Sequence, residues 1–269
     1  MRPLTFLSDY GTADEFAGVV HAVVARIAPG AHVVDLTHGI PRQDVAAGAL
    51  TLARTLPFAA PGVHLAVVDP GVGGRRRAVA LRTAAEERLL VGPDNGLLIP
   101  AAERFGGVAE AVEISASPWR LEPVSATFHG RDVFAPVAAR LALGEPLAAA
   151  GEPLAPAELV PLELPRPQVA DGTLTATVAA VDVFGNVVLH AGASDLAAAG
   201  LAAGARVLVR ALASHAATVA GTFADVPDGD ALVYVDAAEL VAVAINGGDA
   251  AAMLGVAPGG ELAIAAADA

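Results

Sequence analysis

The sequence predicts an α/β fold, with an N-terminal α/β domain built on a mainly parallel sheet and a smaller C-terminal β-barrel domain. Short apolar runs typical of strands alternate with stretches of helical periodicity through residues 1–150. Such alternation is typical of strand–helix–strand units, which pair their strands in parallel. Beyond residue 172, strand-like runs follow one another between turn residues, and this pattern favours a small β-barrel or sandwich.

The N-terminal elements follow from periodicity. Continuous apolar runs of strand length predict strands at Leu4–Leu7, Val33–Leu36, Leu65–Val68 and Leu89–Val91. Apolar residues three and four positions apart predict helices at Glu15–Ile27, Val45–Leu56 and Val133–Leu143.

A Pro-rich segment separates the two halves of the chain. We expect an N-terminal catalytic domain over residues 1–150, a linker over 151–172 and the β-barrel over 173–269, because frequent Pro is typical of linkers and surface segments. Strands are then expected at Thr173–Asp182, Val187–His190, Arg206–Ala211, Ala231–Val235, Leu240–Ile245 and Glu261–Ala265.

Composition limits the chemistry. The chain of 269 residues is 55% hydrophobic, which is enough for a substantial core, and its net charge of −13 argues against binding to nucleic-acid phosphates. There is no Cys, and all 16 basic residues are Arg. Thiol nucleophiles, iron–sulfur clusters and lysine Schiff bases are therefore excluded.

The N-terminal apolar run is too short for a signal peptide, and no segment approaches the roughly 20 apolar residues of a membrane span. We therefore expect a soluble cytoplasmic protein without a membrane partner.

The segment from Asp69 to Arg77, Asp-Pro-Gly-Val-Gly-Gly-Arg-Arg-Arg, is the most informative. A buried-looking strand delivers a carboxylate into a Gly-rich turn that ends in three guanidinium groups. Gly lets the backbone approach a ligand closely, so charges seven residues apart can fold back onto one point. A solvated surface turn is the alternative interpretation.

Carboxylates also follow the first predicted strand, at Asp9 and Asp14. The carboxyl ends of parallel strands border the crevice in which α/β proteins bind ligands. The turn lacks a dinucleotide-binding glycine pattern, and an acidic lining suits sugar hydroxyls or a positive charge better than pyrophosphate. Asp14 has a second interpretation as a cap of the following helix.

Asn occurs at three positions, Asn95, Asn186 and Asn246, each beside Gly. Turn geometry alone is sufficient to explain Asn246 and is one of two interpretations of Asn95. Asn186 is different, because Asp182-Val-Phe-Gly-Asn186 interrupts a strand pattern and brings a carboxylate, an aromatic ring and an amide together. Such groups can recognise a purine or an amine.

His129 precedes a predicted helix in a Gly-containing loop, where catalytic side chains are often displayed. A structural role is the alternative, and Asp132 is expected to cap the helix. The other His residues, including His21 and His38, do not form a metal-binding spacing, so no metal is expected.

Five ordered motifs carry a family resemblance. They are Ser-Asp9-Tyr-Gly, Val-Asp69-Pro-Gly-Val-Gly, Gly-Pro-Asp-Asn95-Gly-Leu-Leu, Phe-His129-Gly-Arg-Asp and Asp182-Val-Phe-Gly-Asn186. From residue 4 to roughly residue 265 the chain resembles the S-adenosyl-L-methionine (SAM) hydrolases that form adenosine, the SAM hydroxide adenosyltransferase family, which shares its fold with SAM-dependent fluorinases and chlorinases. The resemblance implies a homotrimer with active sites between the N-terminal domain of one subunit and the C-terminal domain of its neighbour.

The resemblance also implies the reaction and its residues. Water attacks C5′ of SAM and displaces methionine, without a cofactor, and Asp69, Arg76 and His129 match the water-activating triad. Which of Asp69 and His129 takes the proton stays open. Substrate-binding residues are implied as follows: Asp9 for the ribose hydroxyls, Asp14 and Asp182 for the methionine ammonium, Asn186 for adenine, Phe184 and Phe223 beside the purine, and Asn95 and Asn246 in the same site.

Two alternatives remain beside the hydrolase. The first is a SAM-dependent halogenase. Halogenases of similar fold have another residue at the position of Asp69, because an anionic side chain would repel halide, so Asp69 favours water as the nucleophile. The segment Asp236-Ala237-Ala238-Glu239 departs from related proteins where the methionine carboxylate is bound, which keeps open an inactive SAM or adenosine sensor.

Overall fold

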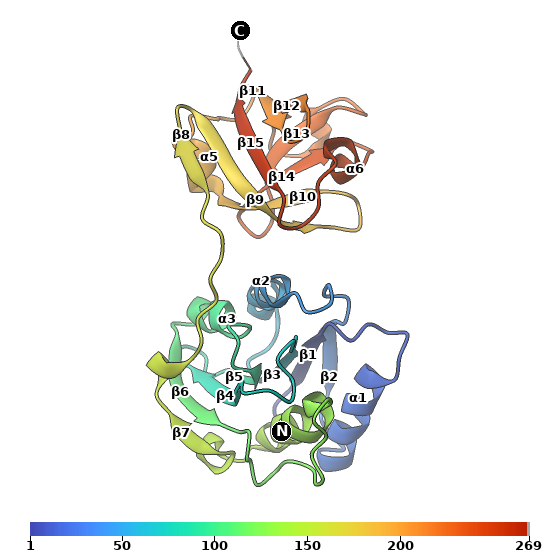
Figure 1. Cartoon of the computed structure of the whole chain (residues 1–269), viewed down its shortest axis with the longest axis vertical. Coiled ribbons are helices and arrows are strands. Elements are labelled where there is room, and N and C mark those ends of the chain that lie inside the picture. The colour runs from blue at the N-terminus through green and yellow to red at the C-terminus, as the bar shows by residue number, and fades with distance from the viewer. Residues whose placement is uncertain (268–269) are drawn as a thin grey trace. The chain divides into compact units, whose positions relative to one another are not determined.

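The computed structural model describes residues 1–267 and divides into two compact units, Met1–Glu163 and Leu164–Ala269 (Figure 1). The segment expected as a linker is partly built into both units. Its first residues form β7 (Glu152–Leu154) in the first sheet, and its last residues include β8 (Gln168–Ala170) in the second.

The first unit is a seven-stranded sheet in the order β2-β1-β3-β5-β4-β6-β7. Besides β7, the strands are β1 (Leu4–Ser8), β2 (Val33–Thr37), β3 (Val63–Val67), β4 (Ala78–Thr83), β5 (Leu89–Pro93) and β6 (Val108–Glu113). The α/β class is confirmed, and the sheet itself is mixed. Strands β2, β1, β3 and β5 pair in parallel, whereas β4, β6 and β7 join the sheet through antiparallel pairs. The connection from β4 to β5 is too short for a crossover, so these two strands form a hairpin.

Helices cover both faces of this sheet (Figure 1). Helices α1 (Phe16–Ile27) and α4 (Ala135–Leu143) pack on one face, and α2 (Val45–Thr55) and α3 (Ile99–Arg104) pack on the other. Every residue of β3 is buried, with alternate side chains in the two cores. This explains why its sequence is apolar except for His64, since a sheet covered on both faces needs no polar side.

The second unit is a β-barrel. Its strands are β9 (Thr173–Val181), β10 (Val187–Gly192), β11 (Arg206–Arg210), β12 (Ser214–Val219), β13 (Ala231–Val235), β14 (Leu240–Ile245) and β15 (Glu261–Ala266). They follow the order β10-β14-β13-β12-β11-β15-β9, and the pairing of β10 with β9 closes the barrel, as the sequence predicts. Short helices α5 (Ala193–Ala198) and α6 (Ala250–Leu254) pack against its core.

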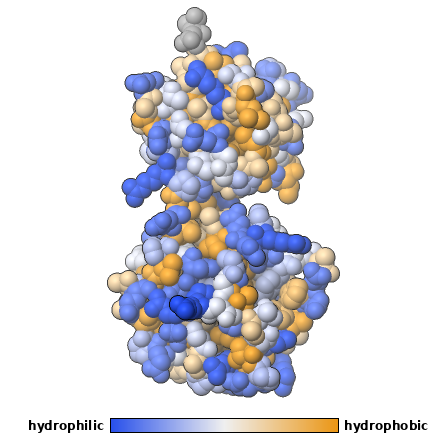
Figure 2. Space-filling view, in the orientation of Figure 1, coloured by the Kyte–Doolittle hydropathy of each residue, from blue (hydrophilic) through white to orange (hydrophobic). Residues whose placement is uncertain are grey.

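The visible surface of each unit intersperses hydrophilic and hydrophobic side chains (Figure 2). Within residues 1–267, no helix combines the length and the apolar character needed to cross a bilayer.

Candidate active site

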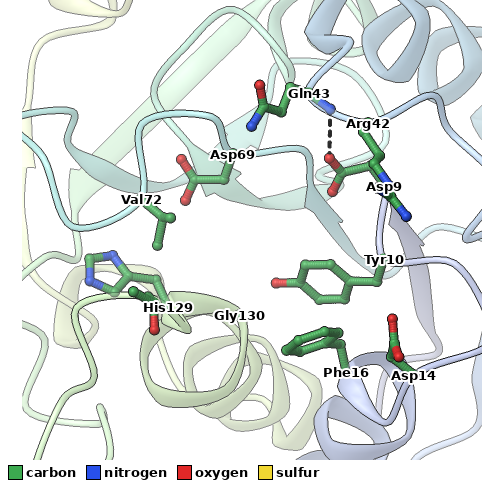
Figure 3. A pocket seen from close by; sticks show the side chains of 11 residues that line it. Asp9, Tyr10, Asp14, Phe16, Arg42, Gln43, Asp69, Val72, His129 and Gly130 are labelled. Atoms are coloured by element: carbon green, nitrogen blue, oxygen red, sulfur yellow. Dashed lines mark hydrogen bonds between the residues drawn. The ribbon is translucent and has the colours of Figure 1, made fainter.

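A cavity of about 440 Å³ opens in the first unit where β1 and β3 end (Figure 3). It is the crevice expected beyond the carboxyl ends of parallel strands. Four of its lining residues, Asp9, Asp14, Asp69 and His129, were predicted from the sequence to belong to the site. The remaining lining residues are Tyr10, Phe16, Arg42, Gln43, Val72, Thr127 and Gly130.

The Gly-rich turn after β3 folds Arg76 back onto Asp69. Arg76 Nε donates to Asp69 Oδ1 at 2.7 Å, and its Nη2 donates to Asp69 Oδ2. Both side chains are largely buried, with 11% and 6% of their surface exposed. Arg77 instead pairs with Asp94, and Arg75 is exposed, so only the middle guanidinium of the three binds Asp69.

Arg76 also joins His129 to this pair. Its Nη2 lies 3.0 Å from His129 Nδ1. Its guanidinium lies over the ring of Phe134, 5.2 Å from the ring centre. The three residues that the sequence predicts as a triad therefore form one hydrogen-bonded group at the cavity.

Burial, and after it the charge of Arg76, lowers the pKa of His129 below its ordinary 6.5, and Asp69 and Asp132 oppose this only in part. The imidazole is therefore neutral at neutral pH. Contrary to the sequence prediction, Asp132 does not cap the helix that follows. It is buried within the turn Gly130–Phe134, where its carboxylate accepts from Arg131 and from the Ser125 backbone amide.

Tyr10 was missed by the sequence reasoning, although it lies in the first quoted motif. Burial, followed by the charges of Asp69 and Asp9, raises the pKa of the Tyr10 hydroxyl far above its ordinary value, so it stays protonated. The hydroxyl end points toward Asp69 and His129 (Figure 3) and lies so close to the Cα of Gly130 that a side chain there would collide with it. Gly130 is thus required by this contact.

The other wall of the cavity holds the predicted carboxylates. Asp9 Oδ2 accepts from the backbone amide of Gln43 at 2.8 Å, which fixes one of its oxygens. Helix α1 has Glu15 at its N-cap position and no side-chain cap, so Asp14 is not the expected cap. Its carboxylate lines the cavity instead, beside Phe16 (Figure 3).

The second unit has its own cavity, of about 710 Å³, which is lined by four more of the predicted binding residues. The loop between β9 and β10 supplies Asp182, Phe184 and Asn186, and the short turn Phe223–Asp225 supplies Phe223. Residues missed by the sequence reasoning are Tyr234, Ile245 and Asp249, whereas Gly247 and Gly248 are the neighbours of Asn246 that the sequence offered as backbone contacts to adenine. Phe184 is 74% exposed, so its ring is accessible to a ligand in this cavity.

Asp182 and Asn186 are held in one rigid arrangement. Asp182 Oδ1 accepts from the backbone amides of Phe184 and Asn186, each at 2.9 Å, and its Oδ2 accepts from Asn186 Nδ2 at 2.8 Å. The Tyr234 hydroxyl has a raised pKa, because of burial and then the charges of Asp182 and Asp236. These contacts explain why a carboxylate and an amide occur together in this loop.

The remaining two Asn side chains are committed elsewhere. Asn95 Nδ2 donates to the carbonyl of Val68 at 2.9 Å, beside Asp69, and its Oδ1 accepts from the amide of Leu97. Asn246 Nδ2 donates to the carbonyl of Val226 at 2.9 Å. Neither lines a cavity described above, so their contribution is to hold backbone next to lining residues.

The segment Asp236–Glu239 forms the tight turn between β13 and β14. Asp236 Oδ1 accepts from the amides of Ala238 and Leu240, and Glu239 adopts a left-handed conformation with φ of 65°. This segment is therefore a structural hairpin turn.

A group that could hold a metal lies in the first unit. His21, Asp35 and His38 each offer a ligand atom, and these atoms lie within 4.8 Å of one another. Sequence spacing did not identify the group because its members come from separate elements.

Comparison with known proteins agrees with the five motifs. Residues 4–151 match the N-terminal domain of the SAM hydroxide adenosyltransferase family, and residues 176–263 match its C-terminal domain. The chain belongs to the SAM hydroxide adenosyltransferase family.

Several members of this family, and some more distant proteins, resemble the chain over most of its length. An (R)-S-adenosyl-L-methionine hydrolase of Salinispora arenicola is 51% identical, with 98% of this chain and 97% of the relative covered. The corresponding hydrolase of Thermus thermophilus is 41% identical over 96% of this chain and 98% of its own. A fluorinase of Actinoplanes is 30% identical over 90% of each chain.

Among solved structures, an uncharacterised conserved protein from Thermotoga maritima superposes with a TM-score of 0.89 and is 37% identical. It covers 97% of this chain and 99% of its own. The SAM hydroxide adenosyltransferase fold of the chain is thus shared over both units.

Proposed function

We propose that the protein hydrolyses S-adenosyl-L-methionine to adenosine and L-methionine by attack of water on C5′ of the ribose. The observation that carries this proposal is the hydrogen-bonded group of Asp69, Arg76 and His129 at the cavity of the first unit. The names of the relatives support the substrate, and they specify the (R) epimer at the sulfonium.

The main requirement of the reaction is a water molecule that is positioned in line with the C5′–S bond and deprotonated as it attacks. The oxygen of water forms a bond to C5′ while the C5′–S bond breaks, and its electron pair goes to sulfur, so a neutral thioether leaves. The leaving group therefore needs no acid. A positioned base and fixed dipoles must bring the water in line and take its proton, and a base of this kind typically contributes ~10² to 10⁴ in rate.

We assign the proton to Asp69. Arg76 can only donate, so the nitrogen of His129 that faces it, Nδ1, is the acceptor of that bond. The neutral imidazole then carries its hydrogen on Nε2 and can hold the water by donating to it, while Asp69 accepts the proton and later releases it to solvent. Arg76 keeps both partners in place.

Binding roles divide between the two units. We propose that Asp9 binds the ribose hydroxyls and that Asp14 and Asp182 face the methionine ammonium. Asn186 reads adenine, and Phe184 and Phe223 flank the purine, with Gly247 and Gly248 as close backbone neighbours. The two fixed oxygens of Asp182 and the exposed ring of Phe184 support this assignment.

One substrate molecule then contacts residues of both units. We propose a homotrimer in which each active site combines the first unit of one subunit with the second unit of its neighbour. The cytoplasmic location expected from the sequence also stays a prediction.

The deciding experiment is incubation with SAM in ¹⁸O-enriched water, with and without chloride, followed by mass spectrometry of both products. Label in adenosine and unlabelled methionine would establish attack of water at C5′. A chlorinated nucleoside would instead make the protein a halogenase, a possibility that the fluorinase relatives raise. Bound but intact SAM would favour the sensor.

A further inference from the structure

Three potential metal ligands converge beside the ends of β1 and β2. They are His21 on α1, Asp35 in β2 and His38 just after β2. His21 Nε2 lies 2.8 Å from Asp35 Oδ1, and His38 Nε2 lies 3.2 Å from the same oxygen. Two imidazoles and one carboxylate on one side of a site are a ligand set that divalent transition metals favour.

The orientation of His38 gives a second, independent indication. Its side chain is only 6% exposed, and Nε2, which points into the cluster, is the buried side-chain nitrogen within residues 1–267 that no hydrogen bond satisfies. Native proteins rarely leave a buried polar atom without a partner, so this nitrogen calls for a ligand.

Ser8 fixes the opposite side of the His38 ring. Its Oγ lies 2.7 Å from His38 Nδ1 and also accepts from the backbone amide of Tyr10 at 3.2 Å. With Nδ1–H donating to Ser8, Nε2 presents a lone pair to the cluster. Metal-binding His residues commonly have such a second hydrogen bond, which sets the tautomer and the direction of the ring.

The spacing and access also suit a metal ion. Ligand atoms around a tetrahedral ion with bonds of ~2.0–2.1 Å are about 3.3 Å apart, and the observed separations of 2.8 and 3.2 Å and the outer limit of 4.8 Å bracket this value. The side chains of His21 and Asp35 are 35% and 44% exposed, so an ion can enter and water can complete its coordination.

We propose that His21, Asp35 and His38 bind a divalent transition-metal ion such as Zn²⁺, at a site separate from the reaction centre. The ion would join α1 to β2 and to the segment just after β2. The backbone amide of Gly11 donates to the carbonyl of His38 at 2.8 Å, so the site braces the loop that displays Asp9 and Tyr10. No step of the proposed hydrolysis passes through this ion.

The test uses the full chain without an affinity tag, freed of metal with a chelator and then dialysed. Titration calorimetry with Zn²⁺ should show one saturable equivalent per chain. Co²⁺ should give the visible absorption of a nitrogen- and oxygen-ligated ion. Loss of an outer-sphere partner alone weakens metal sites about 10- to 100-fold, so His21→Ala and Asp35→Asn should each weaken binding by at least about 100-fold.

Both variants change exposed side chains, which avoids the folding risk of replacing buried His38. His32→Ala is the matched control, because His32 is an exposed residue of the same unit outside the cluster, and it should bind Zn²⁺ as the unaltered chain does. Zn²⁺ should also raise the Tm of the unaltered chain and of the control, but not that of the two variants. Absence of a saturable equivalent, or equal affinity in all variants, would overturn the site and leave a plain ion-pair cluster.

Discussion

Arg76 donates a hydrogen bond to Nδ1 of His129 at 3.0 Å, and this contact decides the tautomer of the imidazole. A guanidinium has no acceptor, so Nδ1 must supply the lone pair and the neutral ring carries its hydrogen on Nε2. His129 can therefore donate a hydrogen bond from Nε2 to a ligand in the cavity. The carboxylate of Asp69, already held by the same guanidinium, is the group able to accept a proton.

Asp69→Asn should lower kcat by ~10² to 10⁴ and leave SAM binding within a few-fold, because the amide keeps the shape of the carboxylate but cannot accept the proton. Single-turnover kinetics together with equilibrium dialysis of SAM would measure both. Unchanged turnover would remove Asp69 from the mechanism. Arg77, which pairs with Asp94, offers the control, and Arg77→Gln should retain kcat.

Activity should fall at acid pH as His129 gains a proton. Its pKa lies below 6.5 owing to burial and Arg76, so the neutral, active form is complete at neutral pH and kcat/KM declines only as pH falls through this lowered value. Protonation would place a cation beside Arg76 and break their hydrogen bond. The His129→Gln variant should have a low kcat/KM, and its pH profile should lack this decline at acid pH.

The charge of Asp69 raises the pKa of His129, so replacing Asp69 should shift the decline of kcat/KM at acid pH to lower pH. The residual activity of Asp69→Asn should persist to lower pH than that of the unaltered chain. A decline that moves to higher pH would show that another group titrates.

Much of the first unit was predictable because the apolar runs of its central strands β1, β3 and β5 are fully buried. Strand β3 is the clearest case, since every residue is buried and the run ends directly at Asp69. Strands β4 and β6 were not predicted. Arg82 in β4 and Glu110 in β6 are partners across the sheet, and such charged positions interrupt the apolar pattern that marks a strand.

The site was predictable where a residue type has few structural uses. The Gly-rich turn after Asp69 led us to expect an Arg folded back onto this carboxylate, and the family resemblance implied that Arg76 and His129 join it. Tyr10 and Tyr234 were not identified, because an aromatic residue has a ready explanation as core. The cluster of His21, Asp35 and His38 depends on the approach of α1 to β2, which local spacing does not encode.

Acid should destabilise the first unit through a second His. His64 is fully buried between Thr5 and Arg88, and burial followed by the charge of Arg88 lowers its pKa to about 3. The unfolded chain therefore binds a proton below pH 6.5 that the folded chain does not. The stability contributed by neutral His64 is complete above pH 6.5 and declines as pH falls toward about 3.

His64→Gln removes this titration. Between about pH 6.5 and pH 5 the unaltered chain should lose up to about 2 kcal/mol more free energy of unfolding than the variant. Urea unfolding at one protein concentration would measure the difference. The exposed His32→Ala variant is the control and should follow the unaltered chain, whereas equal acid sensitivity of His64→Gln would assign the loss to other groups.

Mixing two defective chains tests whether a site is shared between subunits. Asp69→Asn impairs a residue of the first unit and Asn186→Ala one of the second, and each chain alone should turn over little SAM at concentrations well below KM. In a trimer with shared sites, random co-assembly of equal amounts should make about one quarter of the sites intact, because each intact site needs one sound unit from each kind of chain. Differently tagged chains, co-expressed and purified through both tags, would exclude the two homotrimers and raise the intact share to about one third, because each mixed trimer has one intact site among its three. If each site lies within one chain, the mixture stays as inactive as its components, and a mixture of Asp69→Asn with His129→Gln, both changed in the first unit, should show no recovery under either arrangement.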